Sequence, residues 1–370
     1  MKEHLQIAKD LWNELLAYSK ECYQKTRKFP SKFELQKQVK GKGLYSQTQQ
    51  TIAHRVSNSI FKVFKLRKMG IRCGFPRFKS IDRVKSLLYP QSGFKLDQSL
   101  KVTPFGEISI KQHRKIEGKI KTLTLKKEPS GKWFAVFCIE REMKQKEPKS
   151  NLGDGIGLDL GLKVFAVLSN GEKINNPRHL KKYEDKLAFC QRLLSRRKKG
   201  SKNREKAKLK VARIHENISN ARSDFLHKIS KQLVNDHSFI ALEKLASKKM
   251  SEKRFGKQIN DAGWNAFANM LRYKAEEAGC RVIFVDPKNT TQECSSCHEI
   301  VKKDLSDRTH RCPSCGLVVD RDLNAAMNIL NHGLRQLGRE LPEIKPLREG
   351  TNTDINSHQQ VPLMKEEAAP

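Results

Sequence analysis

Four cysteines in the last third of the chain constrain its fold more than any other feature. Cys294 and Cys297 form one Cys-x-x-Cys pair, and after fourteen intervening residues Cys312 and Cys315 form a second. Two such turns can hold one zinc ion in a tetrahedron of thiolates, whereas unrelated core cysteines have no reason to repeat a spacing. The spacing therefore predicts a four-cysteine zinc ribbon with one structural Zn²⁺. The other five cysteines stand alone, which is typical of a reducing compartment.

The charge of the chain is strongly positive and unevenly distributed. The formal net charge is +34, and all of this excess lies in residues 1–250, because residues 251–370 carry equal numbers of basic and acidic side chains. Positive charge at this density attracts a polyanion, so nucleic acid is the favoured partner and an anionic membrane is not. The sequence contains no apolar run of about 18 residues and no apolar leader, so we expect a cytoplasmic protein.

The first 150 residues change from a helical to a strand-like pattern. Apolar residues at helical spacing predict two helices within residues 5–69, and we assign residues 1–84 to a helical recognition lobe. Residues 85–150 contain short alternating segments that predict the strands of a small β-barrel, followed by a charged linker. The clearest of these segments are residues 107–112, 119–128 and 133–142.

From about residue 154, predicted strands alternate with predicted helices. We therefore expect residues 151–335 to form a mixed sheet covered by helices, with the zinc ribbon inserted at residues 288–318. Trp264 lies on an amphipathic helix and is expected in the core rather than on a stacking surface for bases. Residues 336–370 are polar and are expected to form a disordered tail. The predicted fold class is multi-domain α/β.

Three carboxylates lie at the ends of these predicted elements. Asp159 belongs to the first strand, Glu243 ends a later strand, and Asp322 opens the helix after the ribbon. Carboxylates gathered at one end of a sheet repel one another unless cations neutralise them, and Mg²⁺ prefers such oxygen ligands. Two Mg²⁺ ions can activate a water molecule and stabilise the leaving oxygen of a phosphodiester. Acids at strand ends also serve as caps and ion-pair partners, so position alone leaves their role open.

Five segments in this half of the chain form an ordered set of motifs, at residues 155–171, 220–245, 289–297, 311–316 and 320–330. The set resembles the TnpB (OrfB) family of transposon-encoded RNA-guided DNA endonucleases, which is related to type V CRISPR effectors. Residues 71–80 and 131–140 also resemble segments of this family.

The resemblance implies an RNase H-fold, RuvC-like nuclease domain that contains the ribbon. It also implies that the helical lobe and a wedge-like β-barrel hold a guide RNA and read a short motif beside the DNA target. The same resemblance implies that Asp159, Glu243 and Asp322 hold two Mg²⁺ ions and are catalytic.

The sequence departs from the family pattern at two places. His298 follows the second cysteine where the family has glycine, and a side chain in such a left-handed position costs about 1 kcal/mol. Family members usually begin with a basic strand ahead of the first helix, so the barrel is expected to lack one strand.

Several residues are weaker candidates for nucleic-acid contact. Gln can read adenine through two hydrogen bonds, but it is also an ordinary exposed helix residue. A basic helical turn can likewise be a solvated hairpin rather than an RNA contact, and Asp224 in the RxDFLHK motif is expected to be a structural partner. The candidates are Tyr45, Gln49 and Gln50 in the second helix, Arg77 and Lys79 in the segment 71–80, Arg196 and Arg197 in the basic turn, and Arg222 and His227 in the RxDFLHK motif.

The sequence thus predicts an RNA-guided DNA endonuclease with a guide RNA and a double-stranded DNA target as partners. It would be nucleoid-associated when bound to DNA, and the sequence leaves monomer and dimer open. Two alternatives remain. A non-cleaving RNA-guided regulator is disfavoured by the three acids, whereas a transposase acting directly on DNA ends would use the same acids, and only the family resemblance argues against it.

Overall fold

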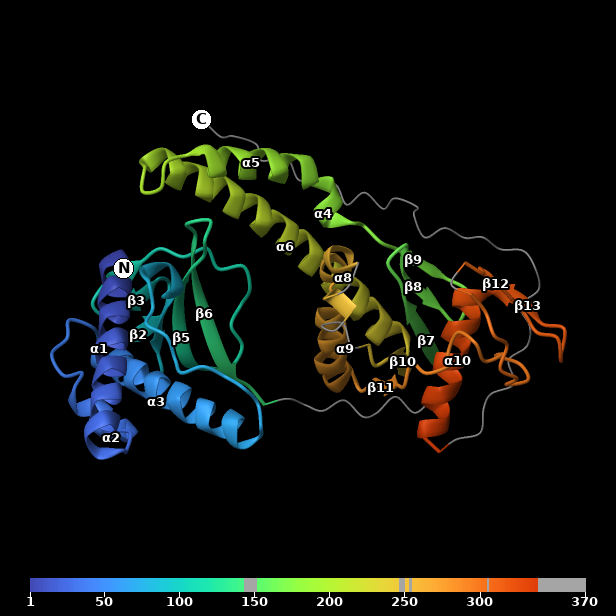
Figure 1. Cartoon of the computed structure of the whole chain (residues 1–370), viewed down its shortest axis with the longest axis horizontal. Coiled ribbons are helices and arrows are strands. Elements are labelled where there is room, and N and C mark those ends of the chain that lie inside the picture. Colours follow the sequence, from blue (N-terminus) through green and yellow to red (C-terminus); the bar gives the residue numbers. More distant parts are fainter. Residues whose placement is uncertain (143–151, 246–249, 253–254, 305, 339–370) are drawn as a thin grey trace. The chain divides into compact units, whose positions relative to one another are not determined.

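The computed structural model describes residues 1–142, 152–245, 250–252, 255–304 and 306–338. The chain divides at Glu142 into two compact units, which we describe separately (Figure 1). Most of the predicted charged linker lies outside the described residues, and so does the predicted disordered tail from residue 339 onward. Within the described ranges, no helix is both long and apolar enough to cross a membrane.

The first unit combines helices with two small antiparallel sheets that share one apolar core. The two predicted helices are confirmed as α1 (Lys2–Thr26) and α3 (Ser46–Lys68), and α2 (Lys32–Lys37) lies between them. The sheets have the strand orders β1-β5-β6 and β2-β3-β4. Their bounds are β1 Ser86–Tyr89, β2 Phe94–Leu96, β3 Leu100–Val102, β4 Gly106–Ile108, β5 Lys119–Lys127 and β6 Trp133–Glu140.

The second unit is built on a five-stranded mixed sheet of order β11-β10-β7-β8-β9. Strand β10 (Phe239–Glu243) runs parallel to both β7 (Gly155–Leu160) and β11 (Arg281–Val285). Strand β8 (Val164–Leu168) pairs antiparallel with β7, and the short β9 (Lys173–Asn175) pairs antiparallel with β8. The predicted mixed sheet is therefore present, whereas β9 was not predicted.

Helices cover both faces of this sheet (Figure 1). Helices α6 (Lys202–Asp236) and α9 (Trp264–Ala278) cover one face, where Trp264 is only 5% exposed, as expected for a core residue. Helix α10 (Arg321–Gln336) covers the other face. The other described elements are α4 (His179–Lys182), α5 (Glu184–Arg196), α8 (Gly256–Ala262), β12 (Thr309–Arg311), β13 (Val318–Asp320) and two short 3-10 helices, η1 (Ile81–Arg83) and η2 (Leu152–Asp154).

The alternation of side chains along β7 decides which residues meet α10. Ile156, Leu158 and Leu160 belong to the core beneath α6 and α9. Successive residues of a strand point to opposite faces, so Gly157 and Asp159 point toward α10. The same alternation in β10 places Phe239 and Ala241 in the core beneath α10 and its last residue, Glu243, on that face too.

Helix α10 comes unusually close to the sheet at two glycines. A Cβ atom added to Gly157 would lie 2.1 Å from the carbonyl oxygen of Ala326, a distance that real Cβ atoms do not adopt. On α10 itself, a Cβ at Gly333 would lie 2.7 Å from the Cβ of Ala241. Any residue with a side chain at Gly157 or Gly333 would collide with the opposing element. The two glycines therefore determine the distance between α10 and the sheet.

We expect Gly157→Ala to destabilise the protein, because α10 must move for the methyl group to fit. Overpacking of this kind costs about 1–3 kcal/mol, which urea denaturation can measure. Gly74→Ala is the control, since its Cβ would meet nothing within 4 Å and its backbone is not left-handed. Equal stability of the two variants would show that α10 is not held at Gly157.

Candidate metal centres

The fold brings the three predicted acids to one end of the sheet. Leu242 pairs with Leu158 in the parallel ladder, so Glu243 and Asp159 follow at matching positions of neighbouring strands. Both point to the face covered by α10, and Asp322 lies in the first turn of that helix. The three carboxylates are close enough for the charges of Glu243 and Asp322 to act on Asp159.

Burial and mutual repulsion change how these acids titrate. Burial, followed by the charges of Glu243 and Asp322, raises the pKa of Asp159 from its usual 3.8 to about 7. Burial also raises the pKa of Glu243, although a hydrogen bond from Thr290 opposes this shift. Both acids therefore resist ionisation in the absence of a cation.

Two neighbouring residues at the start of α10 have different structural roles from Asp322. The Asp320 Oδ1 accepts hydrogen bonds from the backbone N–H groups of Asp322 and Leu323, at 2.9 and 3.1 Å, and so caps the helix. The guanidinium of Arg321 donates to Oδ1 of Asp322 at 3.0 and 3.1 Å and to the carbonyl of Asp307. The charge of Arg321 lowers the pKa of Asp159, in opposition to the acids.

The four cysteines gather as the spacing predicts. Their sulfur atoms all lie within 4.8 Å of one another. Cys294 Sγ is 3.6 Å from Cys315 Sγ, and Cys297 Sγ is 3.5 Å from Cys312 Sγ. A tetrahedral zinc ion with Zn–S bonds of about 2.3 Å requires sulfur separations of about 3.8 Å, so this donor set fits Zn²⁺.

The two cysteine turns have the same backbone geometry. Cys294 N–H donates to Glu299 O and Cys312 N–H to Leu317 O, both at 2.9 Å. Backbone N–H groups of Cys315 and Ser314 lower the pKa of Cys312 to about 6, whereas burial and hydrogen bonds with the neighbouring thiols raise the pKa of Cys297 to about 12. Each turn ends in a left-handed residue.

The left-handed residue that ends the second cysteine turn is Gly316 (φ 74°), and the one that ends the first is His298 (φ 65°). The predicted left-handed position of His298 is therefore confirmed.

Buried polar side chains that the sequence did not reveal connect the ribbon to α10 and the acids. Asn328 Nδ2 donates to Thr290 O at 2.9 Å, and Thr290 Oγ1 donates to Glu243 Oε1 at 2.5 Å. Asn324 Oδ1 accepts from the backbone N–H of Ser295 at 3.0 Å. The i, i+4 spacing of the two asparagines on a predicted buried helix was the one available signal.

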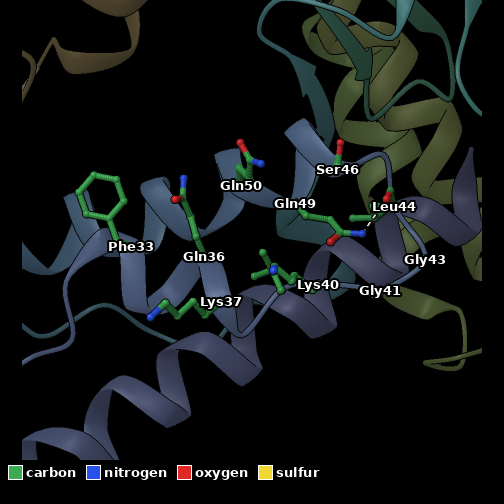
Figure 2. A pocket seen from close by; sticks show the side chains of 11 residues that line it. Phe33, Gln36, Lys37, Lys40, Gly41, Gly43, Leu44, Ser46, Gln49 and Gln50 are labelled. Carbon is green, nitrogen blue, oxygen red and sulfur yellow. Dashed lines mark hydrogen bonds between the residues drawn. The ribbon is translucent and has the colours of Figure 1, made fainter.

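Of the candidates at the start of α3, Gln49 and Gln50 line a cavity of about 580 Å³, whereas Tyr45 precedes the helix as its N-cap. Gln49 is buried and its amide donates to Leu44 O at 2.6 Å, an interaction drawn in Figure 2. The Tyr45 hydroxyl is 2.8 Å from Ser92 Oγ, and its ring stacks on Tyr89. Gln50 is exposed and lines the cavity (Figure 2). Gln49 and Tyr45 thus have structural partners, whereas Gln50 presents its amide to solvent.

In the segment 71–80, Arg77 is exposed and Lys79 is half-buried. The Lys79 ammonium lies 3.1 Å from the centroid of the Trp12 ring, and burial lowers its pKa to about 8. Asn13 fixes the backbone of Lys79 through two hydrogen bonds. Lys79 therefore holds this segment against α1, while Arg77 remains accessible.

The remaining candidates lie on α5 and α6, which form a helical hairpin in the second unit (Figure 1). Arg196 and Arg197 are exposed at its turn. Arg222 forms an ion pair with Asp261 at 2.7 Å, so it joins α6 to α8, and His227 is exposed near Tyr273. Asp224, expected to be structural, forms an exposed ion pair with Lys228 at 2.7 Å.

Comparison with known proteins shows the family. Residues 136–254 match the OrfB_IS605 family, described as "Probable transposase", and residues 264–329 match the "Cas12f1-like, TNB domain" family. The chain is 32% identical over 300 residues to "Putative RNA-guided DNA endonuclease InsQ" of Escherichia coli K12, covering 75% of this chain and 74% of that protein. The chain belongs to the TnpB (OrfB) family. A second TnpB-family relative, "Putative RNA-guided DNA endonuclease" of Streptomyces pristinaespiralis, is 34% identical over 65% of this chain and 60% of its own length.

A solved structure shares the fold of this TnpB-family chain. It is titled "Cryo-EM structure of the Cas12f1-sgRNA-target DNA complex" and matches with a TM-score of 0.54 and 15% sequence identity. The match covers 89% of this chain and 82% of that chain. At this identity, the likeness establishes the mixed α/β architecture.

We expect Cys312→Ser to abolish zinc binding, because one of the four ligands is lost. In small ribbons the apparent free energy of zinc binding is roughly 10–16 kcal/mol and is coupled to folding, so a ribbon that lacks a ligand should not fold around the ion. Elemental analysis of the wild-type protein, purified without chelators, should give about one zinc per chain. Ser296→Ala, a change at an exposed position of the first turn, is the control and should retain zinc. A wild-type protein without zinc would contradict the assignment.

We also expect the protein without added Mg²⁺ to lose stability as the pH rises. Folding raises the pKa of Asp159 from 3.8 to about 7, so the folded state binds a proton at this residue more tightly than the unfolded state. The resulting contribution to the free energy of unfolding is fully present below about pH 4 and is lost as the pH rises through 7. The shift corresponds to about 4 kcal/mol. Calorimetry between pH 5 and 8 should therefore show a steeper fall in Tm for the wild type than for Asp159→Asn. Parallel curves would contradict this reading.

Proposed function

We propose that the chain is an RNA-guided DNA endonuclease encoded by a transposable element. It would cleave double-stranded DNA next to a short adjacent motif by Mg²⁺-dependent phosphodiester hydrolysis. The observation that carries this proposal is the convergence of Asp159, Glu243 and Asp322 in a chain whose curated relatives are named putative RNA-guided DNA endonucleases.

The electrostatics of the acids support a role as ligands of two Mg²⁺ ions. When bound, such ions activate a water molecule and stabilise the leaving oxygen of the phosphodiester. Asp159, Glu243 and Asp322 would together hold the ions, because Asp159 experiences the charges of both other acids. Thr290 orients the Glu243 carboxylate, and the Asp320 cap fixes the helix turn that carries Asp322.

The topology supports a finer description of the fold. A sheet of order β11-β10-β7-β8-β9, in which β7 and β8 are antiparallel and β7 and β10 parallel, suits an RNase H-fold, RuvC-like domain. We propose this domain at residues 151–335, with the ribbon at 288–318. The helices and the two small sheets of the first unit would form the recognition lobe at 1–84 and the wedge-like barrel at 85–150.

The distribution of charge supports guide RNA and DNA as partners. The net positive charge lies in residues 1–250, and exposed Arg77, Arg196 and Arg197 could contact phosphates without reading sequence. Guide pairing would supply the sequence specificity. The similar Cas12f1 chain was solved in a complex with an sgRNA and target DNA.

A transposase acting directly on DNA ends is the second candidate, because the family matched by residues 136–254 is described as a probable transposase. The two functions differ in their need for RNA. Sequencing the RNA that copurifies with the chain, and assaying cleavage after nuclease treatment, separates them. Cleavage that is independent of RNA would favour the transposase.

We expect Asp159→Asn, Glu243→Gln and Asp322→Asn each to reduce DNA cleavage by more than about 100-fold, because each removes a metal-ligand charge. RNA binding, measured by filter retention, should stay within a few-fold because it depends on phosphate contacts elsewhere. The matched control is Asp320→Asn, two residues from Asp322, since asparagine caps a helix as well as aspartate does. Normal cleavage by Asp322→Asn would remove that residue from the metal site.

A further inference from the structure

A buried carboxylate joins the first cysteine turn to α10 and has no role in the mechanism described above. Glu293 directly precedes Cys294 and is only 8% exposed. Its Oε1 lies 2.9 Å from His298 Nδ1, and its Oε2 lies 2.8 Å from His332 Nε2. The two histidines therefore contact different oxygens of one carboxylate. Glu293 thus bridges a residue of the turn and a residue of the helix.

The backbone of Glu293 is bound to the same helix. Its carbonyl oxygen accepts from Asn324 Nδ2 at 2.7 Å and from Asn328 Nδ2 at 2.6 Å. Together with His332 these residues are spaced i, i+4, i+8 along α10, so they form one stripe facing the ribbon. Arg335, one turn further, places Nη1 3.8 Å from Oε1 of Glu293. One residue of the ribbon therefore contacts successive turns of α10.

The turn is shaped around this carboxylate. His298 occupies a left-handed position that Gly316 takes in the other turn. The hydrogen bond between His298 and Glu293 lies within the turn and opposes the conformational strain of a non-glycine residue there. The His298 side chain thus forms one of the contacts of Glu293 from a position that glycine occupies in the other turn.

The same contacts lead to two of the three acids. Asp322 lies in the first turn of α10, two residues before Asn324. The hydrogen bond between Asn324 and Ser295 of the ribbon therefore also restrains Asp322. Asn328 also donates to the carbonyl of Thr290, whose hydroxyl donates to Glu243. Displacing the ribbon from α10 would therefore disturb acids from two different elements.

We propose that Glu293 is a positioning residue that locks the zinc ribbon onto α10 and thereby holds Asp322 and Glu243 at the spacing that their metal ions require. The catalytic half of this inference rests on the proposed nuclease function. The docking half, that Glu293 holds the ribbon against α10, does not depend on it.

The test compares Glu293→Ala with Glu299→Ala, a carboxylate of the same turn that is exposed. We expect Glu293→Ala to keep its zinc and the absorption spectrum of a Co²⁺-substituted four-cysteine site. Hydrogen exchange in residues 324–332 should become at least tenfold faster, and the Mg²⁺ concentration for half-maximal cleavage should rise tenfold or more, the range seen when partners of metal ligands are lost. Glu293→Gln, which still accepts from one histidine, should be intermediate, and Glu299→Ala should match the wild type.

Unchanged hydrogen exchange in α10 for Glu293→Ala would overturn the docking role. Faster exchange with an unchanged Mg²⁺ dependence would overturn the positioning role and leave the nuclease function intact. If the wild-type complex does not cleave at all, the proposed function fails, while hydrogen exchange still decides the docking role.

If Glu293→Ala loses zinc, His332→Ala replaces it, because His332 lies on α10 outside the cysteine turn. Faster exchange in α10 and a several-fold higher Mg²⁺ requirement are then expected, and wild-type values for both would overturn the proposal.

Discussion

The close contact between α10 and β7 is the constraint on which the candidate site depends. Because Gly157 has no side chain, the backbone of α10 at Ala326 can lie directly on the strand. Asp159, two residues along β7, then faces the first turn of α10, where Asp322 lies. A helix raised by the width of one methyl group would carry Asp322 away from Asp159. The distance between these acids therefore depends on the backbone contact between α10 and β7 at Gly157.

The same packing makes the acids electrostatically unfavourable in the absence of cations. Burial and mutual repulsion raise the pKa of Asp159 to about 7, which means that folding opposes its ionisation at neutral pH. The positive end of the α10 dipole and the Arg321 guanidinium offset part of this repulsion. A divalent cation would relieve the rest, so the free energy that folding loses here is recovered when metal binds. The large apolar core beneath α6 and α9 makes such a loss tolerable.

The amino-acid sequence predicts features whose deciding forces are local, but it does not indicate contacts between residues far apart in the chain. Long periodic segments predicted α1, α3 and the buried strands, and two repeated spacings predicted the cysteine cluster. The three-residue strand β9 has no such signal, because it exists only through pairing with β8. The motif around Arg222 does not indicate its ion pair with Asp261, 39 positions later. Likewise, nothing in the sequence distinguishes the buried Glu293 from the exposed Glu299.

A zinc ion bound by the four cysteines would also restrict the chain between β11 and α10. Residues 286–320 separate the end of β11 from the start of α10. As a flexible loop of this length, they would cost about 3 kcal/mol of closure entropy and would leave the first turn of α10 free to move. A zinc ion that folds this segment removes most of its freedom in advance. The contacts of Glu293, Asn324 and Asn328 then attach the folded segment to α10. Zinc-binding free energy would thereby contribute to the placement of Asp322, although no thiolate of the described residues lies among the three acids.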